Sequence, residues 1–207
     1  MMDSRGALAA WQGQRRLFFG VTPSSSQVEQ LAKVLQQLAA PLKPVLPMNL
    51  HLTLRFLGAV EYAQAQALCQ RLDALTDAAG LSEFSVHLQH VKCWTGPKVL
   101  CLAGAVEDPA LVALDAWLDQ LALAQGLAAR QHPLRPHISL ARHAHSTALL
   151  TLEPLQTLKP MVLVADELRL YHSESTADGV RYRVLASWPL QSKGRQQHNP
   201  QVDSAGK

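Results

Sequence analysis

The sequence contains HLTL at residues 51–54 and a similar motif, HISL, at residues 137–140. Each copy is a histidine followed two places later by a hydroxyl residue, Thr53 in the first and Ser139 in the second. Side chains alternate between the two faces of a β-strand, so the imidazole and the hydroxyl share one face while the aliphatic residues between and after them are buried on the other. Each stretch is therefore predicted to be a strand that presents one imidazole and one hydroxyl together.

Two such strands facing each other across a cleft would surround one small anion with the imidazoles of His51 and His137. Histidine has an ordinary pKa of about 6.5, so near neutral pH one ring can serve as a neutral base and the other as a protonated acid. Hydroxyls can donate hydrogen bonds to phosphate oxygens that gain charge in the transition state. One copy alone is better explained as an amphipathic strand with a polar histidine, so the argument depends on the pair and its context.

The composition is that of a folded protein. Hydrophobic residues make up 48% of the 207 residues and charged residues 17%. The net charge of +3 tolerates a polyanionic substrate but does not demand nucleic acid. Three cysteines without C-x-x-C spacing argue against a disulfide framework and a structural zinc site. No signal peptide and no apolar run of about 20 residues is found, which predicts a cytoplasmic protein without a membrane anchor.

The remaining patterns predict an α+β fold with mainly antiparallel strands. Helices are expected after a Ser26–Glu29 capping box, over 65–80 and over 108–126. Strands are expected over 16–21, over a bulged segment 84–93 with a hairpin partner 98–106, over 162–171, and over 180–188 after an Asp178-Gly179 turn. Residues 14–190 are predicted to form one domain between flexible ends, 1–13 and 191–207.

Four segments carry a resemblance to a known family: RRLFFGVTP at 15–23, NLHLTLRFLG at 49–58, RPHISLAR at 135–142, and residues 171–190 with their Gly179, Tyr182 and closing WPL. In this order and spacing they resemble the two-histidine (2H) phosphoesterases, and within them the bacterial LigT-like RNA 2',3'-cyclic phosphodiesterases. The resemblance implies a bilobal fold, in which two pseudo-symmetric halves with antiparallel sheets flank a central cleft and the helices lie outside.

The same resemblance implies an activity and its residues. Enzymes of this family hydrolyse 2',3'-cyclic phosphates to 2'-phosphates and need neither a metal nor a cofactor. By reversal of related chemistry they also join RNA ends through 2'-5' bonds. His51 would be the proton donor and His137 the proton acceptor, although the opposite assignment stays open. Thr53 and Ser139 would hold phosphate oxygens. RNA ends or small cyclic nucleotides are the implied substrates of a monomer; the alternative is a non-catalytic binder of 2'-5' linked or cyclic-phosphate RNA.

Two arginines give conflicting signals. The resemblance makes Arg142 a phosphate contact, whereas strict alternation puts it on the face opposite His137 and Ser139; we follow the resemblance. Strand alternation puts Arg55 on the same face as His51, which would make it a candidate site residue. An arginine on the solvated surface explains its presence there equally well.

Aromatic residues and further histidines complete the candidates. Tyr182 is placed in the cleft by the resemblance, and Phe56 could stack on a base but is expected in the core. His143 and His145, with His132 or His172, could in principle bind a metal, yet no carboxylate or cysteine accompanies them at ligand spacing, so a solvated loop is preferred.

Overall fold

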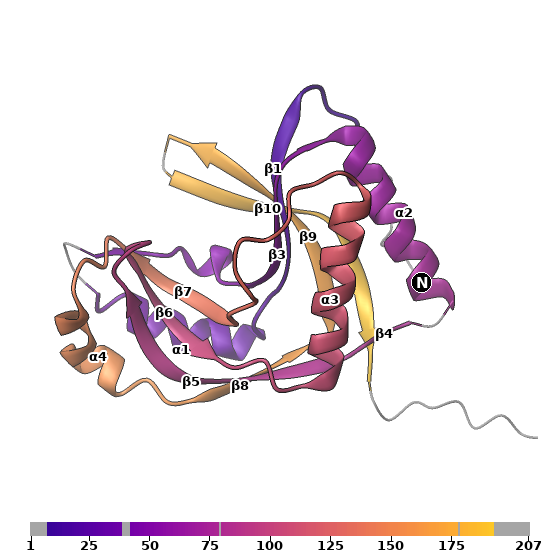
Figure 1. Ribbon diagram of the computed structural model, residues 1–207. Coiled ribbons are helices and arrows are strands. Elements are labelled where there is room, and N and C mark those ends of the chain that lie inside the picture. The colour runs from indigo at the N-terminus through magenta and orange to yellow at the C-terminus, as the bar shows by residue number, and fades with distance from the viewer. Residues whose placement is uncertain (1–7, 39–41, 79, 178, 193–207) are drawn as a thin grey trace, which may run out of the picture.

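The computed structural model describes residues 8–38, 42–78, 80–177 and 179–192 (Figure 1). Its helices are α1 (Ser25–Leu35), α2 (Tyr62–Ala78), α3 (Pro109–Ala124) and α4 (Glu153–Gln156), with 3-10 turns η1 (Pro47–Asn49) and η2 (Thr147–Thr151). Its strands are β1 (Gln14–Val21), β2 (Lys43–Pro44), β3 (Leu52–Glu61), β4 (Leu81–Ser82), β5 (Phe84–Trp94), β6 (Val99–Gly104), β7 (His137–Arg142), β8 (Met161–Ala165), β9 (Glu167–Thr176) and β10 (Gly179–Gln191).

The strands form one 10-stranded sheet in the order β4-β10-β9-β1-β3-β7-β6-β5-β8, with β2 beside β7. Only the β10–β4 pair is parallel among the described pairs, so the predicted α+β class with antiparallel strands is confirmed. The order is symmetric about β3 and β7, with β10-β9-β1-β3 on one side and β7-β6-β5-β8 on the other. The two half-sheets meet where Leu52 pairs with Ile138, and they are therefore joined along the motif strands.

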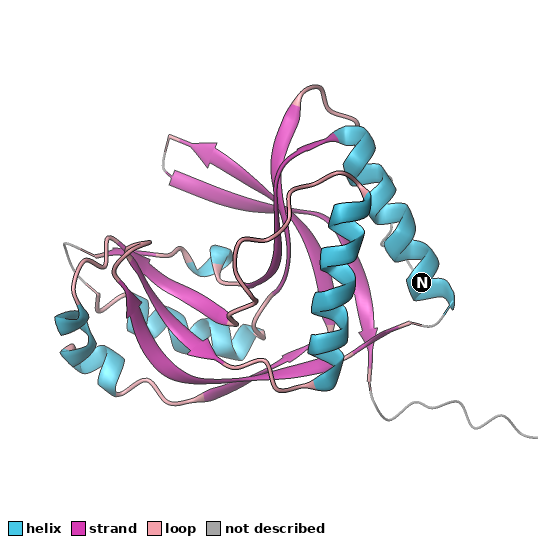
Figure 2. Cartoon of the chain, viewed as in Figure 1, coloured by secondary structure: helices cyan, strands magenta, loops and turns pink. Residues whose placement is uncertain are grey.

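Helices α1, α2 and α3 pack on the outside of the sheet (Figure 2). α2 packs on β3 and β10, α3 packs on β3 and β5, and α1 packs on β7. One continuous apolar core lies beneath them, and it contains the fully buried Leu52 and Ile138 of the motif strands. The face of the motif strands that carries these two residues is thus anchored in the core. Across the described residues, none of the helices has both the length and the hydropathy needed to cross a membrane.

The start of α1 differs from the prediction. The capping box is formed by Ser24 and Gln27, since the Ser24 hydroxyl accepts from the Gln27 amide and the Gln27 side chain accepts from the Ser24 amide. The expected Ser26–Glu29 pair is therefore wrong by two residues. Three consecutive serines offer this motif in several positions, and glutamine serves as well as glutamate at its end.

The single strand expected over 162–171 is also wrong. Asp166 separates β8, which pairs with β5, from β9, which pairs with β1 and β10. Met161, Leu163 and Ala165 are buried before the break, whereas after it the buried residues begin at Leu168 and Leu170. This change of parity at Asp166 lets the chain leave one half-sheet and enter the other.

The ends of the chain were expected to be loose. Yet the Tyr62 hydroxyl donates to the Leu8 carbonyl over 3.1 Å, and Trp11 packs edge-on against Tyr62 with ring centroids 5.2 Å apart. Leu8 and Trp11 of the expected loose segment 1–13 therefore contact α2 through Tyr62. Gln191 ends β10, whereas residues 1–7, residues 193–207 and Asp178 of the expected turn lie outside the described residues.

At Gly20 the backbone of β1 lies very close to the first motif strand, β3, and a substitution there tests this close approach. A Cβ at this position would lie 2.7 Å from the backbone oxygen of Leu52, which cannot move without disturbing the motif. We expect Gly20→Ala to lower the free energy of unfolding by about 1–3 kcal/mol, as overpacking does elsewhere. Urea denaturation measures this. Gly96→Ala is the matched control, because its Cβ would meet no atom within 4 Å; equal stabilities of the two variants would contradict the tight fit.

Candidate active site

The pairing of Leu52 with Ile138 fixes the arrangement of the four polar motif residues. In an antiparallel pair the neighbours on either side are also opposed, so His51 lies across from Ser139 and Thr53 lies across from His137. Leu52 and Ile138 point into the core, and therefore their neighbours point to the other face. Both imidazoles and both hydroxyls thus come together on one face of the sheet.

Backbone carbonyls orient the two imidazole rings. His51 Nδ1 lies 2.6 Å from the carbonyl oxygen of Asn49, and His137 Nδ1 lies 2.7 Å from that of Arg135. A carbonyl oxygen can only accept a hydrogen bond, so in each neutral ring Nδ1 carries the proton and Nε2 carries the lone pair. The hydroxyl of Thr53 then donates to His51 Nε2 over 3.0 Å. Nε2 is accordingly the atom of each ring that can take up or release a proton.

Aromatic packing keeps His51 neutral. Its ring centroid lies 4.8 Å from that of Phe18, 6.0 Å from that of Tyr171 and 4.7 Å from that of Tyr182. Burial lowers the pKa of His51 to about 4, against the opposing effect of the Asn49 carbonyl, while positive charge on His137 and Arg142 lowers it further.

His137 is shifted in the same direction. Burial lowers its pKa below the usual range, the Arg135 carbonyl opposes this, and the charge of Arg142 adds to the decrease. Both rings are therefore uncharged at neutral pH until an anion enters between them.

A bulge follows the hydroxyl residue in each motif strand. In β3 the step from Thr53 to Arg55 is matched by a single step in β1, so Leu54 is an extra residue. The same occurs in β7 against β6, where Leu140 is the extra residue. A bulge reverses the alternation of side chains beyond it. Residues after each motif therefore face the opposite way from the strict period of two.

The reversal brings Arg142 to the polar face. Its neighbour Ala141 is fully buried, whereas Arg142 is exposed and its charge acts on both His51 and His137. This settles the conflict between alternation and resemblance as far as position is concerned: strict alternation fails at Leu140.

The bulge at Leu54 also turns Arg55 away from the face that carries His51. The sequence had predicted Arg55 on the same face as His51, and this prediction is wrong. Arg55 is only 4% exposed. Its Nε lies 2.9 Å from Asp119 of α3, and its other nitrogens donate to the carbonyls of Phe56 and Ala128, each over 2.6 Å. Arg55 therefore fastens α3 and the segment after it to β3.

Phe56 takes the place that the parity had assigned to Arg55. It is 46% exposed, and the guanidinium of Arg16 lies 5.4 Å from its ring centroid. The expectation that Phe56 packs in the core is wrong, because the bulge at Leu54 turns its side chain outward.

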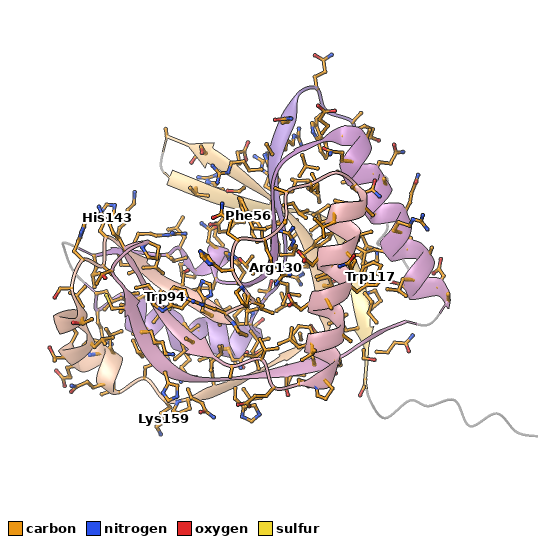
Figure 3. The ribbon with its side chains drawn as sticks, viewed as in Figure 1. Phe56, Trp94, Trp117, Arg130, His143 and Lys159 are labelled. Carbon is orange, nitrogen blue, oxygen red and sulfur yellow. The ribbon has the colours of Figure 1, made fainter. Side chains whose placement is uncertain are left out.

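Three adjoining hollows surround the four polar residues. The largest, about 860 Å³, reaches Thr53 and His137 and is bordered by Phe56, Trp94 and Arg130 (Figure 3). A second, of about 290 Å³, contains His51, Ser139, Arg142 and Tyr182. The third, of about 390 Å³, shares Thr53, Phe56, Arg142 and Tyr182 with the others. All six predicted site residues therefore line one or more of these adjoining hollows.

Comparisons with known proteins agree with this geometry. A family model described as LigT like Phosphoesterase matches residues 21–101. An RNA 2',3'-cyclic phosphodiesterase of Escherichia coli K12 is 28% identical over 152 residues, 72% of this chain and 80% of that protein. The crystal structure of E. coli LigT complexed with 3'-AMP superposes with a TM-score of 0.70 at 28% identity, covering 86% of this chain and 99% of that one. In its sequence motifs and in its fold, the chain is similar to the LigT-like phosphoesterases.

A second relative, the RNA 2',3'-cyclic phosphodiesterase of Geobacillus stearothermophilus, is 29% identical over 145 residues, or 68% of this chain. The match spans 45% of that protein, less than half of its length. The family resemblance drawn from the motifs is thus confirmed.

Two residues of this site were not predicted from the sequence. Trp94 packs edge-on against His137 with ring centroids 4.6 Å apart. Asn49 is a buried polar residue whose side chain donates to the Val180 carbonyl over 2.7 Å and accepts from the Tyr182 amide over 3.2 Å. Its place two residues before His51, amid buried leucines, was the signal available for Asn49.

The alternative of a histidine metal centre has no ligand cluster in the described part of the chain. Nowhere in residues 8–38, 42–78, 80–177 and 179–192 do three His, Cys, Asp or Glu side chains gather closely enough to hold a metal ion. The rings of His143 and His145 have centroids 6.4 Å apart.

The first prediction for this site concerns pH. In the protein without a bound anion, we expect the His51 ring to titrate with a pKa of about 4 and to stay neutral above that pH. Since unfolded histidine binds a proton near pH 6.5 and folded His51 does not, the free energy of unfolding should fall as pH drops from about 6.5 toward 4. NMR titration of the His51 ring, assigned with His51→Gln, measures this. Half-protonation near 6.5 would show that the aromatic enclosure does not act.

The second prediction for this site concerns the stability of the Asn49→Ala variant. Asn49→Ala leaves the Val180 carbonyl and the Tyr182 amide without their partner, so we expect unfolding to become easier by about 1–3 kcal/mol. Thermal and urea denaturation test this, with Gln37→Ala as control because its side-chain bond to the Lys33 carbonyl is exposed. Equal stabilities of the two variants would contradict a clamp between η1 and β10.

Proposed function

We propose that this protein hydrolyses the 2',3'-cyclic phosphate ends of RNA, or of small cyclic nucleotides, to 2'-phosphates. The observation that carries the proposal is the pair of imidazoles on one face of the sheet, each with its Nδ1 held by a backbone carbonyl and its Nε2 available for proton transfer. The two relatives named as RNA 2',3'-cyclic phosphodiesterases and the solved complex of LigT with 3'-AMP support the substrate class.

Each proton in the proposed reaction has a place. His137 Nε2 takes a proton from water as the water oxygen attacks phosphorus. The bond between phosphorus and the 3' oxygen breaks, and His51 Nε2 gives a proton to that oxygen. The products are a 2'-phosphate and a 3'-hydroxyl, and a proton passed from His137 to His51 in the next cycle restores the enzyme.

The electrostatics favour this assignment of roles. A phosphate anion beside His51 raises its pKa and allows it to be charged when substrate is present. Once charged, the histidine with the strongly lowered pKa is the better acid, whereas the other ring retains more basicity. His51 is therefore proposed as the proton donor and His137 as the proton acceptor.

Four side chains are proposed to bind the phosphate and nucleotide. Thr53 donates to His51 Nε2 in the unliganded protein, and when that nitrogen gains a proton the hydroxyl is released to donate to a phosphate oxygen. Ser139 has the corresponding place in the second strand. Arg142 adds a fixed positive charge, and Tyr182 packs against His51 beside the hollow that they share.

The wider setting follows the sequence expectations. We propose that residues 14–190 form the catalytic domain and that the protein is a cytoplasmic monomer. We also propose that the same two histidines catalyse the reverse reaction, 2'-5' ligation. A non-catalytic binder of 2'-5' linked or cyclic-phosphate RNA is the second candidate, but a binder has no need of two proton-transfer groups.

The test of the proposal is turnover of adenosine 2',3'-cyclic phosphate by purified protein in EDTA. We expect adenosine 2'-phosphate as product, and a loss of about 10²–10⁴-fold in kcat for His51→Ala and for His137→Ala. His87→Ala, an exposed histidine of β5, is the matched control and should retain activity. Product analysis by chromatography against both monophosphate isomers measures the outcome.

A modified substrate separates the two roles. With sulfur in place of the 3' oxygen, the leaving group needs no proton, so His51→Ala should recover much of its lost rate while His137→Ala should not. Recovery of the other variant would reverse the assignment. Activity that EDTA abolishes would favour a metal-dependent enzyme, and tight binding of adenosine 2'-phosphate without turnover would favour the binder.

A further inference from the structure

Three basic side chains border the hollow on the His51 side of the site. Lys43 of β2, Arg142 at the end of β7 and His143 just beyond it all line the space of about 290 Å³ that also contains His51 and Ser139. All three are exposed. The hollow therefore runs from His51 and Ser139 to two cations, Lys43 and Arg142, and the imidazole of His143.

The pairing of the strands brings like charges together. Lys43 and Arg142 are direct partners in the antiparallel β2–β7 pair. Like charges at directly opposed positions destabilise a strand pair. β2 is nevertheless held in place, since the Val45 amide continues the pairing by donating to the Leu140 carbonyl over 2.8 Å. The fold thus keeps two repelling cations side by side.

Four other arginines of the described residues are paired with carboxylates. Arg55, Arg130 and Arg183 each lie within 4 Å of an aspartate or glutamate oxygen. Among the described ion pairs, none includes Lys43 or Arg142. An anion that enters the hollow would relieve the repulsion between them.

The backbone also presents His143 in a restricted conformation. Its φ is +63°, in the left-handed region that residues with a Cβ seldom adopt. The next residue, Ala144, is fully buried and its amide donates to the Lys98 carbonyl over 3.1 Å. The turn is therefore fixed, and it directs the side chain of His143 to the border of the hollow.

We propose that Lys43, Arg142 and His143 form a second anion subsite, which binds the phosphate on the 5' oxygen of the nucleotide whose cyclic phosphate is opened. The inference rests on the proposed function and specifies its substrate. In RNA that 5'-phosphate is the diester linking the terminal nucleotide to the rest of the strand. The subsite thereby selects RNA ends and 5'-phosphorylated nucleotides over nucleoside cyclic phosphates.

The kinetic test compares adenosine 2',3'-cyclic phosphate with its 5'-phosphorylated form. We expect the wild-type protein to favour the 5'-phosphorylated substrate at least about tenfold in kcat/KM, the range of a charge-assisted contact. Lys43→Gln should reduce this ratio severalfold, and raised salt should reduce it in the wild type. Lys33→Gln, a change of an exposed lysine on α1, is the control and should leave the ratio and the activity unchanged.

Binding measurements keep the subsite testable apart from catalysis. By calorimetry, adenosine 2',5'-bisphosphate should bind the wild type more tightly than adenosine 2'-phosphate, and Lys43→Gln should narrow the difference. Equal affinities in the wild type, or a difference that Lys43→Gln preserves, would overturn the subsite. Absence of turnover of both cyclic substrates, with the binding preference intact, would overturn the proposed function and leave the subsite standing.

Discussion

The pairing of Leu52 with Ile138 is the contact on which the rest of the site depends. Two half-sheets, each built from four antiparallel strands, are joined through the motif strands at this point. Both partners are fully buried in a common core, so the strands cannot rotate without exposing apolar surface. Their polar neighbours, from distant parts of the chain, are consequently held face to face.

The bulges at Leu54 and Leu140 decide which side chains beyond the motifs face the site. Without them, the alternation of side chains would bury Phe56 and Arg142 and turn Arg55 toward the imidazoles. With them, Arg55 becomes a buried link to Asp119 of α3, and an aromatic ring and a guanidinium take equivalent places on the two sides of the site. The two motif strands are thus alike in backbone and different in what they offer a ligand.

Burial of the histidines gives the site its electrostatic bias. The rings are packed against aromatic side chains and near Arg142, and both the loss of water and the positive charge disfavour the imidazolium form. A negative charge placed between the rings would favour the imidazolium form. Protonation of His51, the proposed proton donor, would thus be coupled to binding of the phosphate group.

The sequence by itself determined the family resemblance, the α+β class, most of the elements, and the two strands that carry a histidine and a hydroxyl, because these follow from local periodicity and short motifs. It failed where the partner strand decides the outcome. The bulges that turn Arg142 outward and Arg55 inward arise from the register against β6 and β1, and the break at Asp166 arises because β8 and β9 pair in different half-sheets. The clamp by Asn49, the contact of Trp94 with His137 and the lowered pKa of His51 likewise required the tertiary structure, since each depends on residues brought together from distant segments.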